Sequence, residues 1–337
     1  MDLLEKAWHK GKNFLKVEYP VIAGGMTWIS DFTLVKAVSE HGAFPVLAAG
    51  NMPPDLFAAE VDRCIKDLKK PFAVNLVTIA PNFKKHYAIL QEKKVEYVVF
   101  AGNFPRKADV QAMKASGKKV MAFASTRSIA EQMIRFGVDA LILEGSEAGG
   151  HIGHVSLIIL LQQVLFGLSR VPVFVAGGIA DGRMIAHLLL MGAAGVQLGT
   201  KFVMTEECSA HKNFKQAFKK ARARQAVATP QYDSRLPVVA VRAVKNTGME
   251  NFGKLQLDLL RKMERNEVSR EKAQFEVENY WMGSLKKAVV DGDVEQGSLM
   301  AGQSVGLVQE VKPMGRMLKE LVTDAAAELR QVKDNFC

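Results

Sequence analysis

Short apolar runs, several of which end at or just before a glycine, recur along the first two thirds of the chain. Eight of them lie at residues 19–26, 44–50, 71–77, 97–102, 119–124, 140–143, 172–176 and 196–198. Helical patterns separate them, among them residues 55–68 and 128–136. Buried parallel strands have continuous apolar sequences, and strands that alternate with helices predict a parallel sheet. Eight such units favour an α/β fold of the closed (β/α)8 TIM-barrel type over an open doubly wound sheet.

The last third of the chain predicts an appended helical part. We expect residues 1–222 to form the barrel, residues 223–312 a helical insertion or lid over its mouth, and residues 313–337 a C-terminal helix that packs back on the barrel. Residues 251–290 are charged and helical in pattern, whereas the small residues of 297–306 place that segment at the cleft. No Gly-x-Gly-x-x-Gly motif follows the first apolar run, which argues against a Rossmann fold.

The composition indicates a large core without disulfides. Of the 337 residues, 48% are hydrophobic. No apolar run reaches the roughly 18 residues that span a bilayer, and residues 1–6 lack a signal-peptide pattern, so we expect a cytoplasmic protein without a membrane partner. Cys64, Cys208 and Cys337 are scattered and odd in number, which indicates neither a disulfide framework nor a cysteine zinc site.

Basic residues give the chain a net charge of +10 and concentrate between residues 208 and 232, where no acidic residue occurs. This charge favours an acidic partner or an anionic ligand, and by itself it does not indicate nucleic acid. Phe214 and Phe218 lie four residues apart within the stretch, as on a solvated helix with one apolar stripe, which is the favoured interpretation. A docking face for an acidic carrier is the alternative. The cations are Lys212, Lys215, Lys219, Lys220, Arg222 and Arg224.

The sequence Glu-Gly-Ser-Glu-Ala-Gly-Gly-His-Ile-Gly-His at residues 144–154 follows the sixth apolar run. Glycines surround His151 on both sides, so its imidazole can approach a ligand without neighbouring side chains in the way. A histidine titrates near neutral pH and can accept or supply a proton beside a carbonyl or nitro group. We therefore predict that His151 is catalytic.

Three other polar groups have weaker interpretations. His154 could bind a metal with His151 and Glu144 or Glu147, but a His-x-x-His pair alone does not define a ligand set, so no metal is expected. Cys208 has no evident base beside it, so we expect no nucleophilic role. Arg183 reaches a phosphate or is simply solvated.

Two glycine-rich junctions end the seventh and eighth apolar runs. Gly177-Gly178 and Gly199-Thr200 would present bare backbone N–H groups where TIM barrels bind phosphate. The alternative is that they form tight turns between strands and helices. Gly24-Gly25-Met26 ends the first apolar run and Asn75 lies inside the third, so both could face the barrel mouth, where glycine backbone and an amide suit the edge of a flat ring system. Met26 could equally pack in the core.

Together these motifs resemble the flavin-dependent family that contains the nitronate monooxygenases (2-nitropropane dioxygenases) and the type II enoyl-acyl-carrier-protein reductases. The resemblance covers nearly the whole chain and implies FMN, with its phosphate between Gly177-Gly178 and Gly199-Thr200 and with Gly150 also among the cofactor-binding residues. It also implies that His151 lies on the substrate side of the flavin. The landmarks are Gly24-Gly25-Met26, Val74-Asn75, Glu147-Ala-Gly-Gly-His151, Ala176-Gly-Gly-Ile-Ala-Asp-Gly182 and Gln197-Leu-Gly-Thr200.

Within this family the chain looks more like the reductases, at residues 149–153, 241–246 and 287–307. The reductase branch implies that NADH or NADPH reduces FMN, which reduces a 2-enoyl thioester in fatty-acid synthesis. It also implies a homodimer and an acidic acyl carrier protein docked at residues 212–224. Ala23 and His154 differ from the glutamine and lysine of the reductases. The alternatives are oxidation of alkyl nitronates with O2 and, more distantly, a non-redox barrel enzyme that acts on a phosphorylated metabolite.

Overall fold

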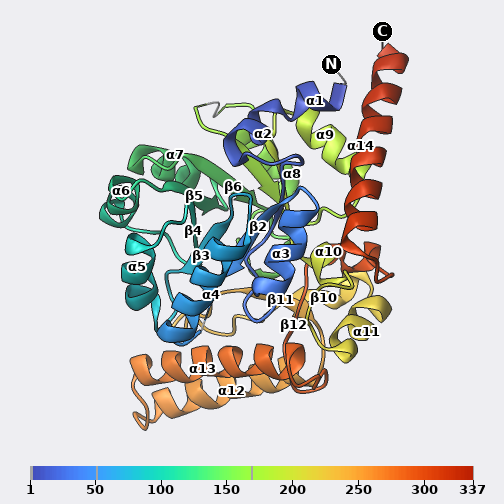
Figure 1. Cartoon of the computed structure of the whole chain (residues 1–337). Helices are drawn as coiled ribbons and strands as arrows, with labels where there is room; N and C mark the ends of the chain where they lie inside the picture. The colour runs from blue at the N-terminus through green and yellow to red at the C-terminus, as the bar shows by residue number, and fades with distance from the viewer. Residues whose placement is uncertain (1–2, 51, 168–169, 337) are drawn as a thin grey trace.

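A computed structural model describes residues 3–50, 52–167 and 170–336. Its centre is a closed barrel of parallel strands in the order β1-β2-β3-β4-β5-β6-β8-β9, which confirms the predicted TIM barrel (Figure 1). Each apolar run overlaps one of these strands. The strands are β1 (Val21–Ala23), β2 (Phe44–Ala48), β3 (Ala73–Val77), β4 (Tyr97–Ala101), β5 (Lys119–Ala124), β6 (Ala140–Glu144), β8 (Val173–Ala176) and β9 (Gly195–Leu198).

Helices surround the barrel. At the start of α3 the carboxylate of Asp31 accepts a hydrogen bond from the Leu34 N–H at 3.0 Å, as a helix N-cap does. The segment after β6 departs from regular α-helix, because α8 continues directly into a π-helical turn, η1. The helices of the ring are α3 (Phe32–Glu40), α4 (Pro54–Asp67), α5 (Phe83–Glu92), α6 (Lys107–Ala115), α7 (Arg127–Phe136), α8 (Leu157–Leu160), η1 (Leu161–Leu165) and α9 (Gly182–Leu190).

Two helices precede the barrel: α1 (Leu3–Ala7) packs against α9 and the C-terminal helix α14 (Met314–Phe336), and α2 (His9–Leu15) closes the amino-terminal end of the barrel. Leu15 is fully buried against the side chains that fill the barrel, and the Tyr97 hydroxyl donates to the Phe14 carbonyl at 2.5 Å. A Cβ at Gly11 would overlap the Ala194 carbonyl oxygen. The backbone of α2 therefore packs directly against the residue that precedes β9. These two helices are not predicted from the sequence, because they are short and largely polar.

The appended part is mixed rather than only helical. Helices α12 (Thr247–Glu264) and α13 (Arg270–Val289) lie side by side and share an apolar cluster around Phe252 and Trp281 (Figure 1). A small antiparallel sheet joins them to the barrel, and the sequence analysis misses its strands because each is two to four residues long. They are β7 (Gly150–His151), β10 (Ala226–Ala228), β11 (Val241–Val244) and β12 (Leu299–Met300).

The remaining helices complete the outer surface. Helix α14 (Met314–Phe336) runs along α9 and reaches α1, so the two ends of the chain lie near each other (Figure 1). The basic stretch forms α11 (Lys212–Lys220), which buries Phe214 and Phe218 as an amphipathic helix does and exposes most of its lysines. A short helix, α10 (Thr200–Val203), follows β9 directly. Within the described ranges, no helix is both long and apolar enough to cross a membrane.

Candidate active site

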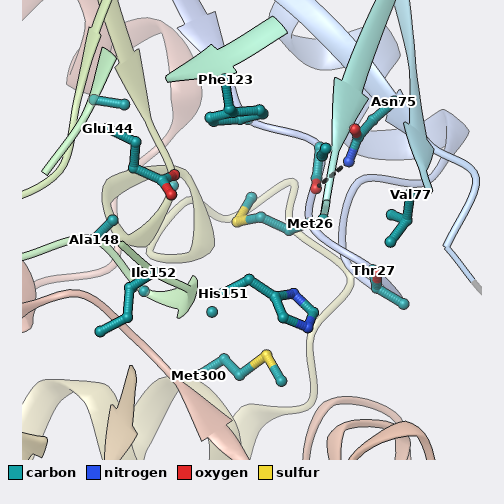
Figure 2. A pocket seen from close by; sticks show the side chains of 18 of the residues that line it. Met26, Thr27, Asn75, Val77, Phe123, Glu144, Ala148, His151, Ile152 and Met300 are labelled. Carbon is teal, nitrogen blue, oxygen red and sulfur yellow. Dashed lines mark hydrogen bonds between the residues drawn. The ribbon is translucent and has the colours of Figure 1, made fainter. Parts of the chain in front are cut away.

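A cavity of about 640 Å³ opens at the carboxyl ends of the barrel strands, beneath α13. The structure brings all ten of the predicted site residues to its wall, although they come from the carboxyl-terminal regions of four barrel strands, β1, β3, β8 and β9, and from the loop strand β7. Figure 2 shows several of them around the cavity. The ten residues are Gly24, Gly25, Met26, Asn75, Gly150, His151, Gly177, Gly178, Gly199 and Thr200.

The junctions after β8 and β9 form a backbone cradle. Gly177 and Gly178 have φ angles of 99° and 72°, in the region that favours glycine, and a Cβ at Gly177 would lie 3.0 Å from the Gly145 carbonyl oxygen. The Thr200 hydroxyl accepts a hydrogen bond from the Gly302 N–H at 3.1 Å, which fixes residues 300–302 against the cradle. Backbone donors without side chains in front of them suit an anionic group.

Asn75 at β3 fixes the loop after β1. Its Nδ2 donates to the Gly25 carbonyl oxygen at 3.1 Å (Figure 2). A Cβ at Gly25 would lie 2.6 Å from the Asn75 Cβ, so only glycine fits there. The Oδ1 atom of Asn75 is buried and has no hydrogen-bond partner in the described part of the chain. A buried acceptor of this kind is normally satisfied, which indicates that a ligand donor belongs beside it.

His151 lies in β7, which pairs antiparallel with β11 through Val241. The Ile152 N–H donates to the Ala240 carbonyl at 2.9 Å and extends this pairing. The imidazole projects into the cavity near Met300 (Figure 2). Burial lowers the pKa of His151 below its ordinary value of 6.5, so the ring is neutral at pH 7. A neutral imidazole carries one N–H donor and one acceptor nitrogen.

Glu144 ends β6 and lines the same cavity (Figure 2). Its side chain is only half-buried by accessible surface because it faces the cavity, yet it lies deep in the molecule, and this burial raises its pKa to about 8. The carboxyl group is therefore largely protonated at pH 7 and can donate a hydrogen bond. From the sequence, Glu144 is considered only as a metal ligand, although its place at the end of an apolar run also indicates a site residue.

Three other polar residues considered from the sequence are His154, Arg183 and Cys208. His154 lines the outer part of the cavity and is exposed. Among the described residues, no group of three or more His, Cys, Asp or Glu side chains is arranged to bind a metal ion. Arg183 does not line the cavity; its guanidinium pairs with Asp181 at 2.8 Å on the surface, so the solvated alternative holds. Cys208 is buried, and burial raises its thiol pKa.

An apolar wall forms the side of the cavity away from the glycine cradle. Ile79 and Phe104 come from the loops after β3 and β4, and Phe275 comes from α13; these side chains are 37%, 48% and 62% exposed. Trp281 and Leu285 of α13 lie deeper and are buried. None of these residues could be identified from the sequence, because apolar positions in a helix do not show what they pack against, and only the tertiary structure brings α13 to the cavity.

The fold and the cavity define a TIM-barrel protein with a covered site at the carboxyl ends of its strands, where the active sites of this fold lie. The chain belongs to the nitronate monooxygenase family, whose model matches residues 9–86 and 77–324. The family members to which it is similar are oxidoreductases.

Three relatives illustrate the range of the family. A (3aS,4S,5R,7aS)-5-hydroxy-7a-methyl-1-oxo-octahydro-1H-indene-4-carboxyl-CoA dehydrogenase of Mycobacterium tuberculosis is 28% identical over 93% of this chain and 95% of its own. A probable nitronate monooxygenase of Staphylococcus aureus is 25% identical over 88% of this chain and 92% of its own. The structure of FabK from Thermotoga maritima superimposes with a TM-score of 0.85, at 32% identity over 96% of this chain and 98% of its own.

The raised pKa of Glu144 predicts a pH-dependent stability. Its folded-state pKa of about 8 lies above the ordinary 4.5, so its contribution to folding is fully present below pH 4.5 and is lost as the pH rises through 8. Glu144→Gln, which is neutral at every pH, should lose this dependence, which is on the order of 1–5 kcal/mol. Urea unfolding of both proteins at pH 5, 7 and 9 measures it. Parallel pH profiles would show that Glu144 does not retain its proton.

Proposed function

We propose that this chain is an FMN-dependent oxidoreductase in which NADH or NADPH supplies the electrons for reduction of a 2-enoyl thioester. Family membership supports the oxidoreductase class and argues against a non-redox barrel enzyme. The similarity to FabK, an enoyl-acyl-carrier-protein reductase II, supports the reductase branch. The Mycobacterium tuberculosis relative is named for a CoA thioester as well.

The residues present fit FMN. The cradle of Gly177, Gly178 and Gly199 offers backbone N–H groups to a phosphate in a space that Cβ atoms would reduce. The buried Oδ1 of Asn75 lacks a donor, and a flavin ring carries an N–H group that would supply one. No Lys or Arg is among the described residues that line the cavity, so main-chain donors would hold the phosphate. When bound, FMN supplies hydride transfer between a nicotinamide and a conjugated carbon.

His151 would orient the substrate at this site. Since burial keeps its imidazole neutral, its N–H serves as a hydrogen-bond donor to the thioester carbonyl better than as a strong acid. Negative charge that develops on that oxygen during reduction would strengthen the hydrogen bond, which is the condition for a catalytic contribution. The α-proton then comes from solvent or from another group at the cavity. Glu144 lines the same cavity and is largely protonated near pH 7, so it would be such a proton source.

The apolar wall is the main observation that supports a thioester over an alkyl nitronate as the substrate. Ile79, Phe104 and Phe275 extend the site from the cradle to the surface, which a small alkyl nitronate would leave unused. An acyl chain or ring would cover these side chains. Oxidation of an alkyl nitronate with O2 is the second candidate, and the family model and the Staphylococcus aureus relative favour it.

An anaerobic titration of the purified protein with NADH and then NADPH tests the proposal. We expect one of the nucleotides to bleach the flavin absorbance near ~450 nm, and a 2-enoyl thioester to restore it. A flavin that ignores both nucleotides but turns over alkyl nitronates in air would support the second candidate instead. Protein that binds no flavin after incubation with FMN would contradict both.

We expect His151→Ala to keep FMN and to lose turnover by about 100-fold or more, because a positioned hydrogen-bond donor to the reacting carbonyl contributes two orders of magnitude or more. The measurements are visible absorbance for bound flavin and kcat with the thioester. His187→Ala is the matched control, since His187 lies on the outer surface of α9 and pairs with Glu328. An unchanged kcat in His151→Ala would remove this histidine from the mechanism.

An acidic acyl carrier protein would dock on the exposed cations of α11 and the turn after it. Lys215 is not available for this contact, because its Nζ donates to the carbonyls of Thr205 and Cys208 at 2.7 and 2.6 Å. Charge reversal at Lys212, Lys219 and Arg222 leaves those bonds intact.

We expect this triple reversal to lower kcat/KM for a carrier-bound thioester by about 10-fold or more and to change kcat/KM for a coenzyme A thioester much less. Reversal of the exposed lysines Lys10, Lys66 and Lys94 is the matched control. Equal losses with both substrates would exclude docking at this surface.

A further inference from the structure

The segment that carries His151 is held by residues of the appended sheet rather than by the barrel. Strand β7 pairs with β11, where Arg242 faces Gly150 and Val241 faces His151. The Gln303 N–H donates to the Glu147 carbonyl at 2.9 Å from the other side. The segment contributes little rigidity of its own, because it contains adjacent glycines and Gly150 has a φ of 75°.

The side chain of Arg242 connects this segment to a third element. Its Nε donates to the Ser146 carbonyl at 2.9 Å, and its Nη1 donates to the Ala226 carbonyl of β10 at 2.6 Å. The guanidinium is half-buried and does not line the cavity. Arg242 therefore ties β10, β11 and the start of the His151 segment together without touching the space in which a ligand would bind.

The imidazole of His151 depends on this support. It forms no hydrogen bond with a described residue that would orient the ring, so its direction follows from the backbone of β7 and from packing. Displacement of a catalytic group by about 1 Å costs a large part of the rate, and sites therefore need a rigid supporting shell.

From this geometry we infer that Arg242 is a positioning residue, which holds His151 in the cavity by bridging the Ser146 and Ala226 carbonyls. The expected loss of kcat rests on the proposed function, whereas the role of Arg242 in holding His151 in place does not. Arginine suits this task because its planar fork presents donors on two different nitrogens in fixed directions, whereas a lysine would have to bring a single nitrogen within reach of both carbonyls. Strand β11 leads through Asn246 into α12, so the same residue links the lid to the catalytic segment.

The test compares Arg242→Ala, Arg242→Lys and the matched control Lys245→Ala. Lys245 follows β11 directly, and its exposed side chain pairs only with Glu250, at 3.5 Å, among the described residues. Each protein is measured for melting temperature, bound flavin, kcat and KM. In addition, the imidazole of His151 is titrated by NMR in protein with 13C-labelled histidine; the chain has 7 histidines, and a His151→Asn sample assigns the signal.

We expect Arg242→Ala to lower kcat by about 10-fold or more while KM changes less than about 3-fold, and Arg242→Lys to recover only part of this loss. The freed segment should expose the ring, so the pKa of His151 should rise toward about 6.5 in Arg242→Ala. Lys245→Ala should match the unmodified protein in every measurement. Glu144 and His154 are the other titratable groups on the cavity wall and are unchanged in all variants.

Two outcomes would overturn the inference. One is a folded Arg242→Ala protein with unchanged kcat and an unchanged His151 pKa. The other is a lower melting temperature, restored by Arg242→Lys, without any shift in the His151 titration, which would make Arg242 a purely structural residue. If the unmodified protein reduces no thioester, the proposed function fails, but the His151 titration still decides the role of Arg242. If Arg242→Ala does not fold, Arg242→Lys gives the same comparison.

Discussion

The pairing of β1 with β9 closes the barrel, and the rest of the site depends on it. Val21, Ile22 and Ala23 pair in parallel with Val196, Gln197 and Leu198. Because every strand of a closed parallel barrel runs in the same direction, all of the carboxyl ends meet at one rim. The residues that follow β1 and β9 are far apart in the chain, yet they become neighbours on the wall of one cavity.

Charge is distributed unevenly between this cavity and the outer surface. The chain has a net charge of +10, but none of the described residues that line the cavity is a lysine or an arginine. Burial raises the pKa of Glu144 and lowers the pKa of His151, so both groups in the cavity favour their neutral forms. The site can therefore donate hydrogen bonds from neutral groups and main-chain amides without carrying a full positive charge.

Much of the barrel could be predicted from the sequence, because apolar strands and capped helices are local patterns. Each of the eight apolar runs overlaps one strand of the barrel. Asp31, whose short acidic side chain is typical of a helix N-cap, caps α3. The ten predicted site residues also line one cavity. Most of them could be predicted because glycine after a strand is visible in the local sequence, and the carboxyl ends of all barrel strands meet at one rim. The resemblance of these motifs to a known family is confirmed by the match of its model. The short strands of the appended sheet could not be predicted, because two paired residues such as those of β7 carry no periodicity.

The sequence by itself determined the barrel, the order of its strands and the glycine-rich strand ends, because these follow from hydrophobic periodicity and from the freedom of glycine. Only the tertiary structure decided how His151 is held, that Glu144 keeps its proton, and that Phe275 and Trp281 of α13 complete the cavity. These properties arise from burial and from contacts between residues distant in the chain. Local sequence patterns contain no information about either until the barrel closes and α12 and α13 cover its mouth.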